Sequence, residues 1–316
     1  MEIEVLEGNT PALKLYLSEG FKIVQRVEGK LEGNEKFAAA GLALRYEAAS
    51  GAMTVKNTDG TKTVYSAAGN AADEAIVLLH GIGADRRMWQ PQIAEFASRG
   101  FYVLAPDLLG HGQSSKVKHI ELQDWERQIL DLLQEQQKKT CILVGVSMGG
   151  VIAQSFAVNH PDKVSRLIVA DTFAELKTPL ERALGISQVV GFWIFKHLGA
   201  VMMARGLSAT YKDPFARQAR DYFSQIALTA DFDQLILARR AINRIDIVES
   251  LRCLKIPTLV IVGNQFGSFF IETNRKIASA VKDAKFVIVE EAMDPSNLVN
   301  PESFNREVLA FVGGKH

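Results

Sequence analysis

The sequence lacks an excess of charge of either sign, since its 316 residues contain 36 Lys and Arg against 36 Asp and Glu. A balanced chain offers no overall field to attract nucleic acid or an anionic membrane. Hydrophobic residues make up 47% and charged residues 23%, the proportions of an ordinary globular protein. We therefore expect a small neutral ligand as the partner, and neither nucleic acid nor a membrane.

Long uninterrupted hydrophobic runs are also absent. The most apolar window, residues 186–209, is broken by Lys196, His197 and Arg205, and such charges are costly at the centre of a bilayer. The window is therefore expected to form a buried or pocket-lining helix. The opening residues MEIEVLEGNT carry no basic segment followed by an apolar one, so no secretory signal is expected. These features predict a cytoplasmic protein.

Cysteine is scarce. Cys141 lies in an apolar strand pattern and Cys253 just before another, so both are predicted to be buried free thiols in a reducing compartment. The sequence has no CxxC motif and no cluster of Cys and His. We therefore predict no metal and no cofactor.

What the chain does contain, from about residue 53, is an alternation of short apolar runs and amphipathic helical stretches, which is typical of a parallel sheet covered by helices. The first element expected is a β-hairpin at 53–69, with Asp59-Gly60 in its turn. Continuous apolar runs that suit parallel strands buried on both faces follow at 75–80, 102–107, 141–147, 166–171, 258–263 and 286–290.

Helical periodicity accounts for much of the rest. In the stretch 122–137, one face carries Trp125, Ile129, Leu132 and Leu133, and we expect this face to pack on the core. Residues from about 173 to 250 interrupt the alternation because they are mostly helical with no clear strand. They predict a helical cap inserted between two strands of the sheet.

The strongest functional signal is Gly145-Val146-Ser147-Met148-Gly149, which fits the motif G-x-S-x-G, follows an apolar strand pattern and opens a helix. In such a nucleophile elbow the serine occupies a strained backbone conformation on a tight turn. Residues without Cβ let neighbouring backbone pass close by, which explains Gly145 and Gly149. Ser147 is the predicted nucleophile.

Together with His80-Gly81, Trp89 and the run DLLGHGQS at 107–114, this elbow resembles the α/β-hydrolase superfamily over residues 53–316, and in particular its esterase, enol-lactonase and haloperoxidase-like members. The resemblance implies an α/β-hydrolase fold in a domain at 49–316, with a mostly parallel sheet flanked by helices and an inserted cap. It also implies an oxyanion hole made by the backbone N–H groups of Ile82 and Met148, with His80, Gly81, Gly145 and Gly149 supporting the site. Such donors are aimed where negative charge develops on a carbonyl oxygen.

The resemblance fails at the other two members of the triad. After the run at 258–263, where relatives carry an acid, this chain has Phe266. After the run at 286–290, where relatives carry a histidine, it has Asp294, although the flanking Ser-Asn-Leu and Pro are kept. A serine hydroxyl needs a base within hydrogen-bond reach, and an aspartate with an ordinary pKa near 4 is a poor one.

Three residues remain candidates for an unconventional base. Asp294 would become a better base if burial beneath the cap raised its pKa. Asp171, at the end of the run at 166–171, lies where some α/β-hydrolases keep their acid. His197 could reach down from the cap, although its helical setting beside Lys196 favours the cap surface.

The first 48 residues do not follow the alternating pattern. They predict a strand, a helix opened by Asn9-Thr10-Pro11, a second strand and a further apolar run at 38–47. The segment 1–48 resembles the C-terminal part of a GNAT-type acetyltransferase at Asn9, Ala12, Leu15-Tyr16 and Gly20-Phe21. No glycine-bearing loop precedes residue 9 to hold a pyrophosphate, so acetyl transfer by this segment is disfavoured against a fusion remnant or docking piece.

The sequence thus leaves three functions open. The first is a weak or unconventional hydrolase of small apolar carboxylic esters or lactones, and the second is a non-catalytic protein of the same fold that binds a small ligand or a protein partner. The third and least favoured is acetyl transfer. The cap residues Phe192, Trp193, Phe195, Met202 and Met203 either line an apolar ligand pocket or pack within the cap, and a homodimer stays open.

Overall fold

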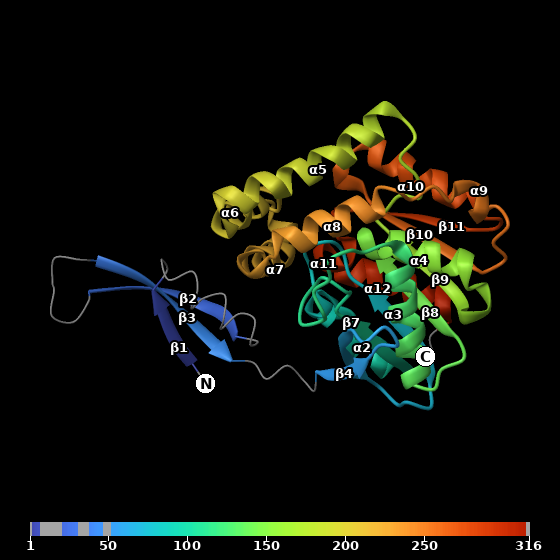
Figure 1. Cartoon of the computed structure of the whole chain (residues 1–316), viewed down its shortest axis with the longest axis horizontal. Helices are drawn as coiled ribbons and strands as arrows, with labels where there is room; N and C mark the ends of the chain where they lie inside the picture. The colour runs from blue at the N-terminus through green and yellow to red at the C-terminus, as the bar shows by residue number, and fades with distance from the viewer. Residues whose placement is uncertain (1, 7–20, 31–37, 47–51, 314–316) are drawn as a thin grey trace.

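The computed structural model describes the backbone of residues 2–6, 21–30 and 38–46 and all atoms of residues 52–313 (Figure 1). Its main feature is an eight-stranded sheet with the order β11-β10-β9-β8-β6-β7-β5-β4. The strands are β4 (Met53–Lys56), β5 (Lys62–Ala68), β6 (Glu74–Leu79), β7 (Phe101–Pro106), β8 (Cys141–Val146), β9 (Val164–Ala170), β10 (Thr258–Gly263) and β11 (Lys285–Val289).

The sheet is parallel from β7 through β11, and antiparallel only where the hairpin β4–β5 joins it at β7. Helices cover both faces: α2 (Gln90–Ser98), α3 (Leu122–Glu135), α4 (Met148–Asn159), α10 (Ser268–Ala280), α11 (Ser296–Val299) and α12 (Pro301–Val312). This arrangement confirms the predicted fold class. The hairpin and the six apolar runs lie where the sequence predicts them, within one or two residues.

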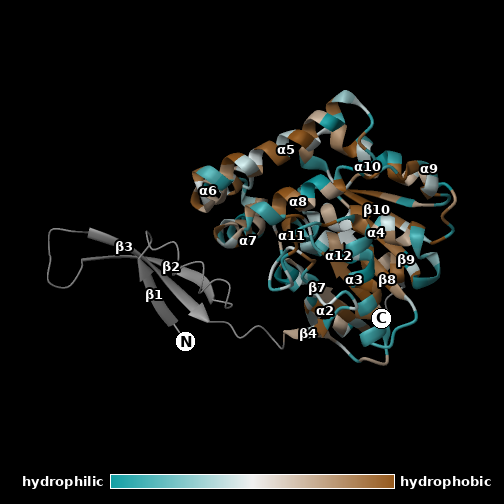
Figure 2. Ribbon diagram, in the orientation of Figure 1, coloured by the Kyte–Doolittle hydropathy of each residue, from teal (hydrophilic) through white to brown (hydrophobic). Residues whose placement is uncertain are grey.

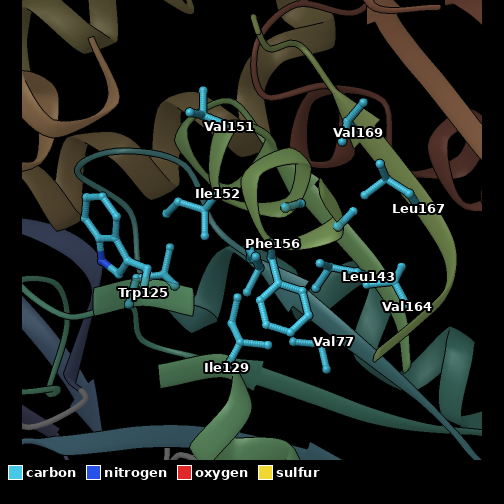
Figure 3. Packing of buried hydrophobic residues seen from close by; sticks show 14 of the residues in the cluster. Val77, Trp125, Ile129, Leu143, Val151, Ile152, Phe156, Val164, Leu167 and Val169 are labelled. Carbon is cyan, nitrogen blue, oxygen red and sulfur yellow. The ribbon is translucent and has the colours of Figure 1, made fainter. Parts of the chain in front are cut away.

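The sheet is held by two apolar layers, because successive residues of each parallel strand point to opposite faces. On one face, Val77 and Leu143 pack under α3 and α4, against Trp125 and Phe156 (Figure 3). The alternate strand residues pack on the other face in a second cluster, which includes residues of α2 and α12. Burying one such side chain contributes roughly 1.5–3 kcal/mol, so these layers fix the sheet and the loops at its carboxyl edge.

The cap lies between β9 and β10 in the chain. It contains α5 (Pro179–Leu198), α6 (Ala200–Thr210), α7 (Arg217–Ile226), α8 (Phe232–Ile242) and α9 (Val248–Leu251). The start of α5 is fixed by a capping box in which Thr178 and Glu181 bond each other's backbone, and by Pro179 in its first turn. In Figure 2 much of the ribbon of α5 and α6 has the colour of hydrophobic residues, yet no helix in the described part of the chain is long and apolar enough to cross a membrane.

Near the N-terminus, β1 (Glu2–Leu6), β2 (Phe21–Lys30) and β3 (Ala38–Tyr46) form a separate antiparallel sheet in the order β1-β3-β2. The apolar run at 38–47 is therefore its central strand. The helix predicted from Asn9-Thr10-Pro11 lies outside the described residues.

One cysteine prediction is wrong. Cys141 is buried at the start of β8, and burial raises the pKa of its thiol to about 12. Cys253 is exposed, because it lies in a turn after α9, where its N–H bonds the carbonyl of Ser250, and not in the strand that follows.

Candidate active site

The site is built on the sharp turn between β8 and α4. Ser147 has φ 55° and ψ −118°, a strained conformation for a residue with a side chain. Its backbone N–H donates to the carbonyl of Ala170 at 2.9 Å, which ties the turn to β9. Gly81 approaches closely, since a Cβ placed on it would lie 3.4 Å from the Cβ of Ser147. The serine is thus held at the carboxyl edge of the sheet beside the loop that follows β6.

The turn requires glycine on both sides of Ser147. A Cβ on Gly145 would lie 2.2 Å from the carbonyl oxygen of Gly149, and a Cβ on Gly149 would lie 2.1 Å from that of Leu79. Backbone atoms cannot move aside as a flexible side chain can. The tight turn and the packing of α4 against β6 therefore both depend on these glycines.

We expect Gly149→Ala to destabilise the protein by about 3 kcal/mol or more, because α4 must move away from β6. Denaturant unfolding measures this. Gly191→Ala is the matched control, since a Cβ at that position of α5 meets nothing within 4 Å and Ala favours a helix by up to about 1 kcal/mol over Gly. A Gly149→Ala protein as stable as the wild type would contradict the close packing described here.

The hydroxyl of Ser147 donates a hydrogen bond of 2.9 Å to Oδ2 of Asp294. Asp294 lies in the loop between β11 and α11, 147 residues after Ser147 in the sequence. Burial raises the pKa of the Asp294 carboxyl well above its usual value, and the negative charge of Asp171 raises it further. The bond from Ser147 and the charge of Arg239 act in the opposite direction. A carboxylate of raised pKa therefore stands where it can accept the serine proton.

The carboxylate of Asp171 bonds backbone groups and not Ser147. It follows β9 with φ 50°, and its two carboxylate oxygens accept the backbone N–H groups of Gly263 at 2.9 Å and of Ser296 at 2.6 Å. Burial raises the pKa of this carboxyl too. Asp171 therefore links the ends of β9 and β10 to the loop that carries Asp294, and it positions that loop without bonding Ser147.

Phe266 provides an apolar wall. It ends the 3₁₀ turn η5 (Asn264–Phe266) that follows β10, and its ring packs edge-on against Phe270 with the centroids 5.5 Å apart. Although 41% exposed, it lines the same cavity as Ser147 and Asp294. The structure thus brings the three predicted positions 147, 266 and 294 together around one cavity.

The predicted oxyanion donors also lie beside Ser147. Met148 is the first residue of α4, and Ile82 follows Gly81 and lines the cavity. Among the described residues, no carbonyl accepts the N–H of Ile82. The first N–H groups of a helix are likewise free to bind an oxyanion, so both donors are available to a ligand.

His80 and His111 hold loops. His80 is buried, with Nδ1 2.8 Å from the carbonyl oxygen of Gly81, and Nε2 accepts the N–H of Leu108 at 3.0 Å. Burial lowers the pKa of His80 to about 4 and that of His111 to about 3. Both rings are therefore neutral, and His80 fixes the loop that presents Gly81 and Ile82.

The remaining histidines of the described chain lie elsewhere. His197 is exposed on α5, with Nδ1 2.8 Å from the carbonyl oxygen of Trp193, so it does not descend toward Ser147. His119 and His160 lie near Glu121 and Glu126. In the part of the chain with described side chains, no histidine bonds Ser147, and no group of three or more His, Cys, Asp and Glu could hold a metal ion.

An open cavity of about 390 Å³ lies beside Ser147 and Asp294 and is lined in part by the cap. Phe192, Phe195 and Met203 line it and also pack within the cap, so they combine the two arrangements that the sequence left open. Trp193 and Met202 are not among its lining residues, and they are 56% and 42% exposed. The same helices thus carry apolar residues on both faces, and only the inner face lines the cavity.

Two residues of the site were missed from the sequence. Tyr211 donates from its hydroxyl to the backbone carbonyl of Asp294 at 2.8 Å, which joins the cap to the loop. Arg239 on α8 interacts electrostatically with the Asp294 carboxyl. A signal for Arg239 exists, because it shares the helical spacing of the buried residues Phe232, Leu235 and Ile242. Nothing in the sequence distinguishes Tyr211.

Comparison with known proteins identifies the family to which this chain belongs. Residues 74–301 match the model of the alpha/beta hydrolase fold family, and the chain belongs to this family. It is 26% identical over 242 residues to 3-oxoadipate enol-lactonase 1 of Acinetobacter baylyi, covering 75% of this chain and 88% of the relative. It is also 26% identical over 251 residues to the pimeloyl-(acyl-carrier protein) methyl ester esterase of Vibrio vulnificus, covering 75% and 94%.

A solved structure shows the same fold. The enol-lactonase from Burkholderia xenovorans superposes with a TM-score of 0.71 at 24% identity, covering 83% of this chain and all of the other. Relatives of this chain therefore include esterases and enol-lactonases with the α/β-hydrolase fold.

Proposed function

We propose that the protein hydrolyses small apolar carboxylic esters or lactones, with Ser147 as the nucleophile and Asp294 as the base. The observation that carries the proposal is the 2.9 Å hydrogen bond from the Ser147 hydroxyl to the Asp294 carboxylate. The esterases and enol-lactonases among the relatives support the reaction class. In this proposal the triad is degenerate, with Asp294 in the position of the histidine and Phe266 in that of the acid.

The proposed reaction has two halves. Ser147 Oγ forms a bond to the carbonyl carbon as its proton passes to Asp294, and the resulting oxyanion is bound by the N–H groups of Ile82 and Met148. The ester C–O bond then breaks, and the leaving oxygen takes the proton from Asp294. Water attacks the acyl group in the same way, with Asp294 again accepting and returning a proton, which frees the acid and Ser147.

The rate should be modest. A whole triad contributes about a millionfold to turnover in a serine protease, whereas the oxyanion hole and binding alone leave roughly a thousandfold over water. Phe266 provides no carboxylate to orient a base, and Asp294 is the only side chain of the described residues that bonds the Ser147 hydroxyl. We therefore expect a turnover above the roughly thousandfold acceleration that the oxyanion hole and binding alone provide, and below that of an enzyme with a whole triad.

Labelling with a fluorophosphonate probe tests the proposal. The wild-type protein is expected to bind the probe covalently, because Ser147 is strained, accessible from the cavity and hydrogen-bonded to a base. Ser147→Ala should show no label, and the matched control Ser187→Ala, which removes a serine hydroxyl from the cavity lining on α5, should label as the wild type. No labelling of the wild type at high probe excess would exclude an activated Ser147.

A second function is favoured by Phe266. An apolar side chain in the acid position suits a protein that retains the cavity to bind a ligand without turning it over, and this is our alternative proposal. It predicts saturable ligand binding with ester turnover no faster than buffer.

For residues 1–48, which resemble part of a GNAT acetyltransferase, we propose a docking segment joined to the domain at 49–316. Saturable binding of acetyl-CoA would instead point to acyl transfer.

A further inference from the structure

Exposed apolar residues gather on the cap helices α5 and α6. Of the thirteen large hydrophobic side chains that are exposed in the described part of the chain, nine lie on these two helices. A soluble protein normally exposes such residues singly, and an exposed apolar patch marks an interaction surface. The nine residues, which we call the cap face, are Leu180, Leu184, Ile186, Val190, Trp193, Ile194, Leu198, Val201 and Met202.

Four residues of the cap face form a row along α5. Ile186, Val190, Ile194 and Leu198 follow one another at intervals of four residues, and Met202 keeps the same interval on α6. Residues four apart lie on the same side of a helix, so the row on α5 is roughly 18 Å long at 1.5 Å per residue. Other residues of α5 pack against α8 and line the cavity, and α5 lies at the outer edge of the cap (Figure 1). The row is thus a surface that the domain itself leaves uncovered.

The charges on these helices select the kind of partner. Their one acidic residue, Glu181, is 9% exposed and accepts two backbone N–H groups at the start of α5. Their Lys and Arg residues are all exposed, and they are Arg182, Lys196 and Arg205. Lys196 pairs with Asp233 of α8 at 2.6 Å. A second copy docked through the same face would bring the basic residues of both copies together, whereas an anionic surface attracts them.

The balanced charge of the whole chain, from which we expected no membrane partner, therefore does not describe this face. The position of the cap face also favours lipid over a protein partner. Ser187 and Gln188 of α5 are both exposed and line the cavity, so the cavity opens to solvent beside the start of the row. A bilayer concentrates apolar ligands, and it would present them at this opening.

We propose that the cap face docks on an anionic lipid bilayer, with α5 and α6 lying in the plane of the interface. The apolar row enters the boundary between headgroups and acyl chains, and the basic residues contact the lipid phosphates. Trp193, which is 56% exposed in the same face, is of a residue type that favours this boundary. Docking needs no reaction at Ser147, so the inference stands apart from the proposed function.

Co-sedimentation of the full chain with vesicles tests the docking. One set of vesicles is phosphatidylcholine alone, and the other is phosphatidylcholine mixed with phosphatidylglycerol. We expect the mixed vesicles to bind at least about tenfold more tightly at low salt, because each Lys or Arg near an anionic surface contributes about fivefold. Binding should weaken as the salt concentration rises.

Single substitutions test the apolar residues of the cap face. Ile194→Glu and Met202→Glu should each weaken binding to the mixed vesicles by at least about tenfold. Both side chains are 42% exposed, so circular dichroism should show an unchanged fold. Met53→Glu is the matched control, because it makes the same change at a methionine that is 43% exposed on β4. It should bind the vesicles as the wild type does.

Tryptophan fluorescence identifies the part of the protein that enters the lipid. Of the three tryptophans in the sequence, Trp89 and Trp125 are fully buried and Trp193 is exposed. Mixed vesicles with brominated acyl chains should therefore quench Trp193 alone. Trp193→Phe should still bind these vesicles but lose the quenching.

Four results would overturn the inference: no binding to either vesicle, equal affinity for both, binding without quenching of Trp193, or equal losses in Met53→Glu and Met202→Glu. A dimer in sedimentation velocity that Met202→Glu dissociates would instead assign the cap face to a second copy. Fluorophosphonate labelling of Ser147 without vesicle binding would leave the hydrolase and remove the lipid surface. Vesicle binding without labelling would leave the lipid surface and remove the hydrolase.

Discussion

Replacing Asp294 by Asn is expected to lower ester turnover by about two to four orders of magnitude, the range that a positioned general base contributes. The amide keeps the size of the side chain but cannot accept the proton of Ser147 in the transition state. Steady-state kinetics on a small p-nitrophenyl ester measures the loss. The matched control Glu291→Gln removes the same charge from an exposed residue of the same loop and should retain full turnover.

The pH profile gives a second measurement of the same role. The base is active only when ionised, so turnover should rise with pH as Asp294 loses its proton. Burial and the charge of Asp171 both raise the pKa of Asp294, so the midpoint should lie above the value near 4 of an ordinary carboxyl. A profile that is flat, or that has its midpoint at the ordinary value, would exclude Asp294 as the base.

Thermal unfolding separates lost chemistry from lost structure in this variant. The pKa of Asp294 is higher in the folded protein than in the unfolded chain, so the stability of the fold falls as the pH rises from the unfolded pKa through the folded pKa. Asn removes that charge. Asp294→Asn should therefore have a Tm at neutral pH no lower than that of the wild type, and a fall in Tm would attribute its inactivity to misfolding.

The double variant Phe266→Asp, Asp294→His is expected to raise ester turnover by about a hundredfold or more. A neutral imidazole accepts a proton on one ring nitrogen while its other nitrogen donates to an acid, and an acid at position 266 would orient it from the end of β10. The two positions line one cavity with Ser147, so the replaced side chains start in the right region. The measurement is kcat/KM on the same ester.

Phe266→Asp alone is the matched control, because an acid has no imidazole to orient when Asp294 is kept. It should gain nothing over the wild type. A double variant that folds and labels at Ser147 but hydrolyses no faster than the wild type would show that the cavity no longer admits the ester in a reactive position.

Much of the fold could be predicted from the sequence because its signals are local. Parallel strands buried on both faces need continuous apolar runs, and each such run of this chain is a strand. The inserted helices follow from the break in that alternation. Cys253 was misjudged because an apolar neighbourhood close to a strand does not place a residue in it, and the turn after α9 leaves the thiol exposed.

Only the residues of the candidate site that belong to a sequence motif could be predicted. Ser147 follows from the elbow, and Asp294 from the retained residues around it. Arg239 and Arg240 are adjacent and chemically identical, and only the packing of α8 buries the first and exposes the second. The bond from Tyr211 to the Asp294 carbonyl likewise depends on how the cap folds over the sheet, which no local pattern encodes.

The negative charge of the Asp171 carboxylate stabilises a proton on the side chain at position 294. Had position 294 carried a histidine, the imidazolium formed during attack would have been attracted to the buried negative charge nearby. With an aspartate there, two carboxylates repel each other, and in the proposed reaction a proton from Ser147 relieves that repulsion. Asp171, held by the backbone of Gly263 in β10 and of Ser296 at the start of α11, therefore favours protonation at position 294 with either residue. In the proposed reaction, the fold thus supplies a driving force for proton transfer that does not depend on a histidine at position 294.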